Sequence, residues 1–191
     1  MQLLLLAAMT FGAAYIRGLT GFGMAIILVP LFGLIVKPGD AVVIAILLQV
    51  LIGPVGLKVI YADAHRQSAL MIAAFAMLAT PLGIWLLMHT SPDLARLMIA
   101  GIAIGAFVLV LLPQRGQLRP GPKETALTGI ASGVLTGFAA MPGPPVVPFY
   151  LRQPIPPTEA RASMMLVFFA TAIAGTISSF ALGLANARLL W

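Results

Sequence analysis

The sequence predicts an all-α integral membrane protein built from two inverted repeats, each starting with a broken or re-entrant helix. Three observations lead to this fold class. Of the 191 residues, 61% are hydrophobic and only 8% are charged, whereas a soluble domain carries about 25% charged residues. Long apolar runs follow one another along the chain. The tetrapeptide LTGF occurs twice, at 19–22 and 135–138, and internal repeats in apolar chains are typical of transporters.

The first half begins with an apolar stretch at 3–36 that is too long for one span, since about 20 residues cross the hydrocarbon. The segment GLTGFG at 18–23 predicts a break inside it. A second stretch follows at 40–61, where Pro54 predicts a kink. These two stretches should form a broken helix followed by a bent one.

Two further apolar runs, at 67–88 and 94–112, predict uninterrupted helices and complete a first repeat at 1–112. The polar, proline-rich segment at 113–122 is the expected connector between the halves. A second repeat then covers 123–191.

The second repeat starts with a broken stretch at 123–151, interrupted at 137–145 by glycines and prolines, and ends with a helix at 158–184. The first repeat continues with two more helices where the second one stops. We therefore expect the second repeat to lack its last helices.

The basic residues favour a hairpin at each broken stretch, returning to the side from which it entered. Six plain spans would divide the loop cations almost evenly between the two sides. Two hairpins instead place Lys58, Arg66, Arg115, Arg119, Lys123, Arg152 and Arg161 on one side and Lys37, Arg96 and Arg188 on the other. Cytoplasmic loops are enriched in Lys and Arg, so the larger group is expected to be cytoplasmic. Three crossings between the LTGF copies would then invert the second repeat relative to the first.

The net charge of +6 does not indicate nucleic-acid binding, because the basic residues lie in short loops between apolar runs. Such loops suit the anionic headgroups of a lipid bilayer. Cysteine is absent, and the two histidines have no partner at metal-ligand spacing. We find no catalytic constellation, metal site or cofactor motif, and we expect no enzyme.

The two predicted breaks are the best candidates for a substrate path. A helix break exposes backbone N–H groups, and the start of a half-helix carries partial positive charge. Two such starts facing each other would bind a small anion. The residues predicted to line this path are Thr20, Gly21 and Gly23 in the first half and Thr136, Gly137, Pro142 and Gly143 in the second. The alternative is that these glycines only allow helices to pack closely.

Arg17 and Gln49 extend this candidate site. Arg17 is the only charge deep in an apolar stretch, one residue before the first predicted break, and a charge at that depth is costly and usually functional. It would attract an anion, although an arginine can also snorkel to the membrane surface. Gln49 lies in the middle of an apolar run, where it would either line the path or hydrogen-bond between helices.

At these motifs the chain resembles the sulfite exporter TauE/SafE family of bacterial membrane transporters. The resemblance extends over essentially the whole chain. It is carried by GLTGFGMAIILVPLF at 18–32, KPGDAVVIAILLQVLIG at 37–53, SALMIAAFAMLATPLGIWL at 68–86 and TGFAAMPGPPVVPFYL at 136–151. Where the family often has a run of glycines after the first break, this chain has Gly23, Met24 and Ala25. The resemblance implies transport of small organic or sulfur-containing anions, such as sulfite or sulfonates, across the bacterial inner membrane.

No nucleotide-binding element is visible, so transport is expected to be secondary, with a proton or sodium as coupling ion. A homo-oligomer is compatible with this sequence. Two alternatives stay open. One is a passive channel for anions or other solutes. The other is a non-transporting membrane partner or a truncated fragment, which the shortened second repeat favours.

Overall fold

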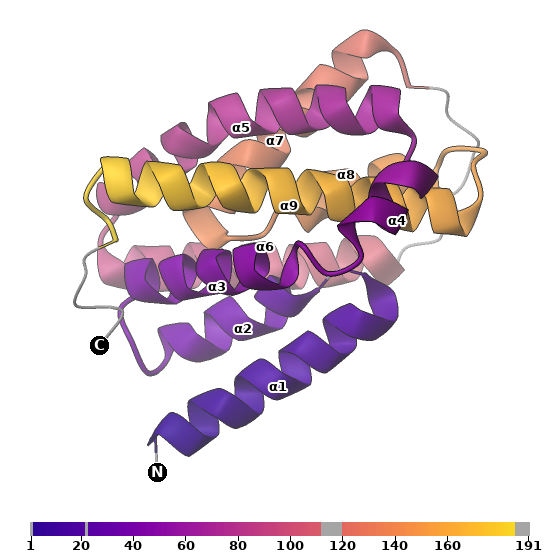
Figure 1. The fold of residues 1–191 in the computed structure, drawn as a ribbon. Helices are drawn as coiled ribbons and strands as arrows, with labels where there is room; N and C mark the ends of the chain where they lie inside the picture. The colour runs from indigo at the N-terminus through magenta and orange to yellow at the C-terminus, as the bar shows by residue number, and fades with distance from the viewer. Residues whose placement is uncertain (1, 22, 112–119, 186–191) are drawn as a thin grey trace.

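The computed structural model describes residues 2–21, 23–111 and 120–185, although not the side chains of 2–6, 19, 20 and 110. These residues form helices and no strands, which confirms the prediction of an all-α protein (Figure 1). The helices are α1 (Gln2–Thr20), α2 (Met24–Gly33), α3 (Pro38–Ile52), α4 (Leu57–Asp63), α5 (Arg66–Met88), α6 (Pro92–Leu111), α7 (Pro122–Ala139), α8 (Gly143–Leu151) and α9 (Pro157–Ala181).

Among the described residues, three helices are long and apolar enough to cross a membrane, namely α5, the first 18 residues of α6, and α9. The pair α3 and α4 would be a fourth, bent by 84° at the break between its helices. Gly56 opens α4 with a φ of 74°, so the kink expected at Pro54 is confirmed as a sharp turn.

The first broken stretch folds back on itself. In Figure 1, α1 runs toward the right-hand end of the molecule and α2 returns toward the left, packed against it. Gly21 and Gly23 both have positive φ, at 83° and 91°, a conformation that costs a residue with a side chain about 1–2 kcal/mol. The predicted break is confirmed, but it is shorter than 18–23 because α1 continues to Thr20.

The second broken stretch also reverses direction, from the end of α7 to the start of α8 (Figure 1). The prediction that 137–145 is interrupted was wrong at both ends, since 137–139 complete α7 and 143–145 begin α8. Ala140 adopts the left-handed conformation with φ 57°, and its N–H donates to the Thr136 carbonyl at 2.7 Å. This cap ends α7 abruptly, and prolines are tolerated in the first turn of α8.

The buried side chains form two clusters. One joins α1, α2, α3, α6 and the end of α5 with residues 138–141 at the second break. The other joins α5, α8 and α9. The second break therefore packs against the helices of the first half rather than standing apart from them.

Helices α5 and α7 make the most extensive contact in the structure. Gly129, Gly133 and Gly137 face α5 at every fourth position of α7, and a Cβ on each would stand 2.1–2.7 Å from the backbone oxygens of Ile72, Ala76 and Thr80. Small residues at this spacing let two helix backbones approach closely in a membrane. The contact fixes α7, and with it the second break, against α5.

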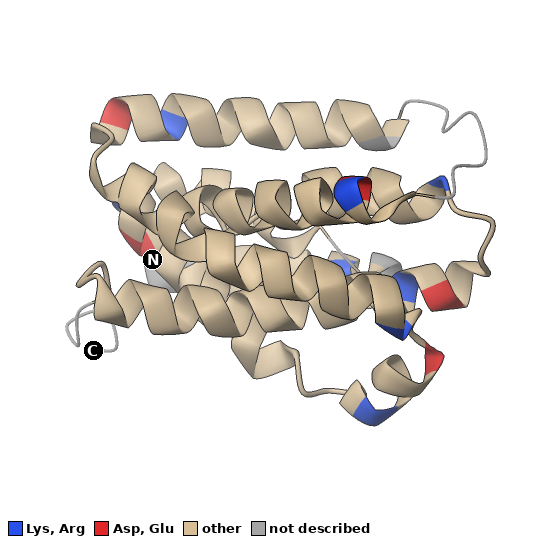
Figure 2. Cartoon of the chain, turned by 90° about the horizontal axis from the view of Figure 1, so that it is seen from above, with Lys and Arg blue, Asp and Glu red and all other residues tan. Residues whose placement is uncertain are grey.

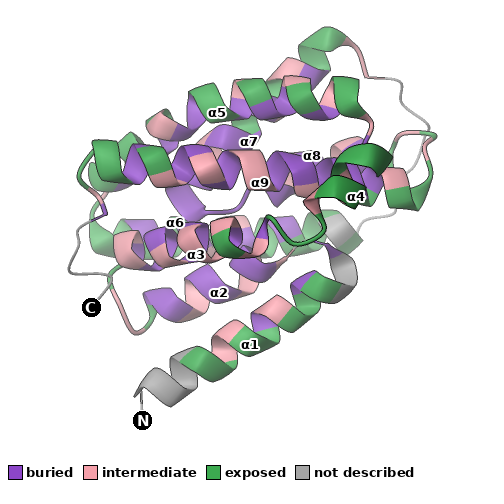
Figure 3. Ribbon diagram, in the orientation of Figure 1, coloured by how far each residue is buried: buried purple, intermediate pink, exposed green. Residues whose placement is uncertain are grey.

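The outward-facing surface suits lipid. Figure 3 shows exposed residues along the outer sides of several helices, and only 17% of the apolar stretch of α6 is buried, compared with 50% for α9. Exposed side chains on α6 include Leu97, Ile104 and Phe107. In water such a surface would drive aggregation, whereas hydrocarbon chains solvate it.

The two ends of the molecule differ in charge. Figure 2 shows Lys and Arg to be more numerous toward the right-hand end than toward the left. The loop between α2 and α3 lies at the left-hand end in Figure 1, and the loop between α8 and α9 at the right-hand end. Lys37 and Arg152 therefore lie at opposite ends, as two hairpins require and six plain spans do not.

Candidate functional site

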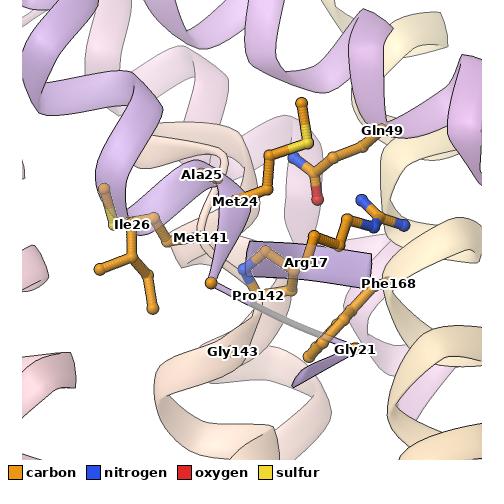
Figure 4. Close-up of a pocket in the computed structure, with 11 residues that line it drawn as sticks. Arg17, Gly21, Met24, Ala25, Ile26, Gln49, Met141, Pro142, Gly143 and Phe168 are labelled. Atoms are coloured by element: carbon orange, nitrogen blue, oxygen red, sulfur yellow. The ribbon is translucent and has the colours of Figure 1, made fainter. Parts of the chain in front are cut away.

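A small hollow lies where the two broken stretches meet. Its volume is about 20 Å³, enough for about one water molecule. Figure 4 shows Arg17 and Gln49 approaching it together with residues of both breaks. The lining consists of Arg17, Gly21, Gly23, Met24, Ala25, Ile26, Gln49, Met141, Pro142, Gly143 and Phe168. Both halves of the chain therefore contribute to one site, and no acidic residue lines it.

Arg17 is the only charged residue of this lining. It lies in the last turn of α1 and is only 6% exposed. All five acidic side chains of the chain are described, and none of them pairs with it, since the one ion pair among the described residues joins Arg96 and Asp93. A buried charge without a counter-ion is costly. Arg17, which the sequence places deep in an apolar stretch, is thus buried within the protein.

The start of α2 provides neutral donors beside Arg17. Gly23 is its N-cap residue and has no side chain to cap the helix. The first intrahelical bond runs from the Ile27 N–H to the Gly23 carbonyl. The N–H groups of Met24, Ala25 and Ile26, all lining residues, are therefore the ones that the helix leaves without an internal partner. Together with the positive end of the helix dipole they favour a negatively charged ligand.

The second break is held by side chains that bond its carbonyl groups. The Gln49 amide of α3 donates from Nε2 to the Ala140 carbonyl at 3.1 Å and to the Ala45 carbonyl at 3.3 Å. The Ser132 hydroxyl of α7 donates to the Pro142 carbonyl at 3.1 Å. Buried carbonyls need such partners, so these bonds keep the non-helical backbone in place.

The second break has fewer N–H groups than the first. Pro142 is the N-cap residue of α8, and Pro144 and Pro145 follow Gly143 in its first turn. Proline has no N–H, so Gly143 supplies the one backbone donor among these four residues. The first break is therefore the stronger source of donors, and the two breaks are chemically unequal.

The structure gathers six of the predicted site residues around the hollow: Arg17, Gly21, Gly23, Gln49, Pro142 and Gly143. Two others lie elsewhere. The Thr136 hydroxyl donates to the Ser132 carbonyl one turn earlier at 2.7 Å, and Gly137 packs against α5, where a Cβ would stand 2.2 Å from the Thr80 carbonyl. The Thr20 side chain is outside the described residues.

Sequence reasoning missed several residues of the site. Met24, Met141 and Phe168 line the hollow, but apolar residues in an apolar chain give no signal of their own. Ser132 also went unnoticed, although it lies at helical spacing before Thr136 on the same face of α7. Its contact with Pro142 depends on how sharply the chain turns after Ala139.

Comparison with known proteins agrees with this architecture. The sulfite exporter TauE/SafE family matches residues 6–191. The chain belongs to this family. The probable sulfite/organosulfonate exporter TauE of Cupriavidus necator is 27% identical over 189 residues, which cover 94% of this chain and 72% of that protein. No solved structure gives a significant match.

Membership of the TauE/SafE family confirms the predicted class of protein. The chain is a membrane transporter rather than an enzyme, and it is a multi-pass protein of the bacterial inner membrane. The resemblance noted at the glycine and proline motifs is thereby confirmed over nearly the full length.

Proposed function

We propose that this TauE/SafE protein is a secondary transporter of small organic or sulfur-containing anions, such as sulfite or a sulfonate, and that the hollow between the two breaks is its binding site. The name of the Cupriavidus necator relative supports this class of substrate. The chemistry of the hollow supports a negative charge, whatever the rest of the substrate is.

Arg17 is the observation that carries the proposal. Its guanidinium is buried beside the start of α2 without a carboxylate partner. A charge costs about 2.5–3.5 kcal/mol at the centre of a membrane helix on insertion scales, which is an upper bound for Arg17 in the last turn of α1. An oxyanion in the hollow would offset that cost, because it accepts hydrogen bonds from the guanidinium and from the N–H groups of Met24 and Ala25.

The small size of the hollow supports a gated site rather than a permanently open pore. A space of about 20 Å³ holds about one water, and sulfite is larger than water. The two breaks must therefore separate before an anion can bind or pass. Such a gated site is typical of alternating access, in which helix breaks meet near the midplane.

The two hairpins also support an inverted repeat. The proposed topology places the ends of α8 and α4 in the cytoplasm and the loop between α2 and α3 outside. The first hairpin then enters from outside and the second from the cytoplasm. Because all five acidic residues lie away from the hollow lining, the coupling ion, a proton or sodium, would bind elsewhere or travel with the substrate.

Flux into liposomes tests the proposal. The purified chain should carry sulfite, methanesulfonate or a simple carboxylate in a saturable manner that depends on an imposed proton or sodium gradient. Arg17→Gln should reduce this flux at least about tenfold, since it removes a charged hydrogen-bond donor worth about 1.5–3 kcal/mol, and Arg17→Lys should retain part of it. Arg96→Gln, which removes a charge outside the hollow, is the matched control. Ohmic single-channel currents would instead indicate a passive channel. Flux that is unchanged in Arg17→Gln would rule out this site.

A further inference from the structure

A second arginine reaches the first break from the other half of the chain. Arg161 lies in the second turn of α9, and its side chain is exposed. Its guanidinium donates from Nη2 to the Gly18 carbonyl at 2.8 Å. Gly18 belongs to the last turn of α1, where carbonyl groups form the negative end of the helix dipole. Arg161 therefore ties α9 to the tip of the first hairpin.

Gly21 makes room for this contact. A Cβ at Gly21 would stand 2.9 Å from the Arg161 Cγ and 3.0 Å from its Nε. The glycine thus serves two purposes, because its φ of 83° also requires the left-handed conformation. No side chain at position 21 could coexist with Arg161 in its present place.

Arg17 and Arg161 approach the same break from different surroundings. The Arg17 carbonyl accepts the Gly21 N–H at 2.7 Å, and its side chain is buried in the hollow. The Arg161 guanidinium lies against Gly21 from the exposed side. None of the five acidic side chains pairs with either arginine. An anion that approaches this end of the molecule can therefore contact the exposed Arg161 side chain before it reaches the buried Arg17.

We propose, on the basis of the anion transport proposed above, that Arg161 is a latch that an oxyanion releases. In the closed state its guanidinium holds the Gly18 carbonyl and keeps the first hairpin against α9. An arriving sulfonate or sulfite adds Coulomb attraction that a neutral carbonyl lacks, and its oxygens match the planar guanidinium. The anion displaces Gly18, the hairpin tip loses its tie to α9, and the hollow widens toward Arg17.

Two measurements on the reconstituted full chain test the latch. The first is the KM of methanesulfonate flux. The second is the rate at which N-ethylmaleimide labels Met24→Cys, a buried position in the lining of the hollow and the only cysteine in that protein. With Arg161 present, methanesulfonate should accelerate the labelling. In Arg161→Gln the cysteine at position 24 should be labelled quickly without anion, and methanesulfonate should cause no further acceleration. KM should rise by up to about tenfold, because the anion loses its contact with the guanidinium but no longer has to displace the Gly18 carbonyl. Arg161→Lys should give KM and labelling rates between those of the chain with native Arg161 and those of Arg161→Gln.

Arg152→Gln is the control, since it removes the same charge at the same end of the molecule. It should leave both measurements close to those of the unaltered chain. If Arg161 only caps α1, Arg161→Gln should lower the thermal midpoint but leave KM and the effect of methanesulfonate on labelling unchanged. That result would overturn the latch, while the proposed transport would stand. If the chain with native Arg161 neither carries nor responds to any of the anions, the proposed function fails, and the latch fails with it.

Discussion

The glycines of this chain serve different physical purposes, although they look alike in the sequence. Gly21 and Gly23 adopt positive φ and make the first break. Gly133 and Gly137 have ordinary helical φ values but lie against the backbone of α5. Gly101 and Gly105 on α6 have open space where a Cβ would be. The same residue type therefore provides a turn, a close contact or a lipid-facing position, and a methyl group added at each should have a different effect.

Gly133→Ala and Gly137→Ala should destabilise the protein strongly. Each new Cβ would stand 2.1–2.2 Å from a carbonyl oxygen of α5, and backbone atoms cannot rotate away as a side chain can. Overpacking of this kind typically costs about 1–3 kcal/mol. The thermal midpoint in detergent measures the effect. Gly101→Ala is the matched control and should change the midpoint little. Equal midpoints for all three variants would contradict the packing of α5 on α7.

Arg17 is a residue whose place in the candidate site could be predicted from the sequence. A lone charge in an apolar stretch predicted a functional site, and the residue lines the hollow. Arg161 gave no such signal, because its position at the start of the last helix suits an ordinary loop cation. Its role depends on α9 crossing the tip of a hairpin that lies far away in the sequence. Only the tertiary arrangement shows that contact.

At the scale of helices, the second break depends on two donors from neighbouring elements. Gln49 reaches across from α3, and Ser132 reaches ten residues along the chain from α7. Each bonds a carbonyl that has left the helical ladder. A break in a membrane protein is stable only where such partners replace water. The second hairpin is therefore held by side chains outside the glycine and proline motif that creates it.

Ser132→Ala should destabilise the second break by about 1–3 kcal/mol, because it leaves the buried Pro142 carbonyl without this donor. The matched control is Ser179→Ala. Ser179 is also buried, but its hydroxyl donates to the Gly175 carbonyl of its own helix, which keeps its backbone partner after the substitution. Thermal midpoints and maleimide labelling of Met141→Cys measure stability and opening of the break. If the two serine variants behave alike, Ser132 is not a support of the second break.

The sequence predicted the helices whose ends depend on nearby residues. Apolar runs and flanking prolines gave α5, α6 and α9 within a few residues of their observed ends. The second break was placed too broadly because glycine and proline permit an interruption without fixing its length. Gly137 was assigned to the substrate path, whereas the structure places it in the contact with α5. The identity of the partner helix decides between these roles, and a single sequence does not contain it.

For the whole molecule, the two hairpins determine which loops share a side. Because each broken stretch returns to its own end, an odd number of crossings separates the α2–α3 loop from the α8–α9 loop (Figure 1). We expect the excess of basic residues at one end to orient the protein, with that end in the cytoplasm. The same arrangement brings the two breaks together from opposite ends of the molecule, so the proposed topology and the proposed binding site depend on one feature of the chain.

Single cysteines test this topology directly, because the chain has none of its own. Lys37→Cys and Arg152→Cys should label from opposite faces of the membrane with an impermeant maleimide, Arg152→Cys from the cytoplasm. Lys58→Cys should behave like Arg152→Cys, and Ser91→Cys like Lys37→Cys, since these pairs lie at the same ends of the molecule (Figure 1). The physical reason is that a re-entrant hairpin adds no crossing. Labelling of Lys37→Cys and Arg152→Cys from one face would require each broken stretch to span the bilayer. The breaks would then no longer approach each other from opposite sides, and the inverted repeat would have to be abandoned.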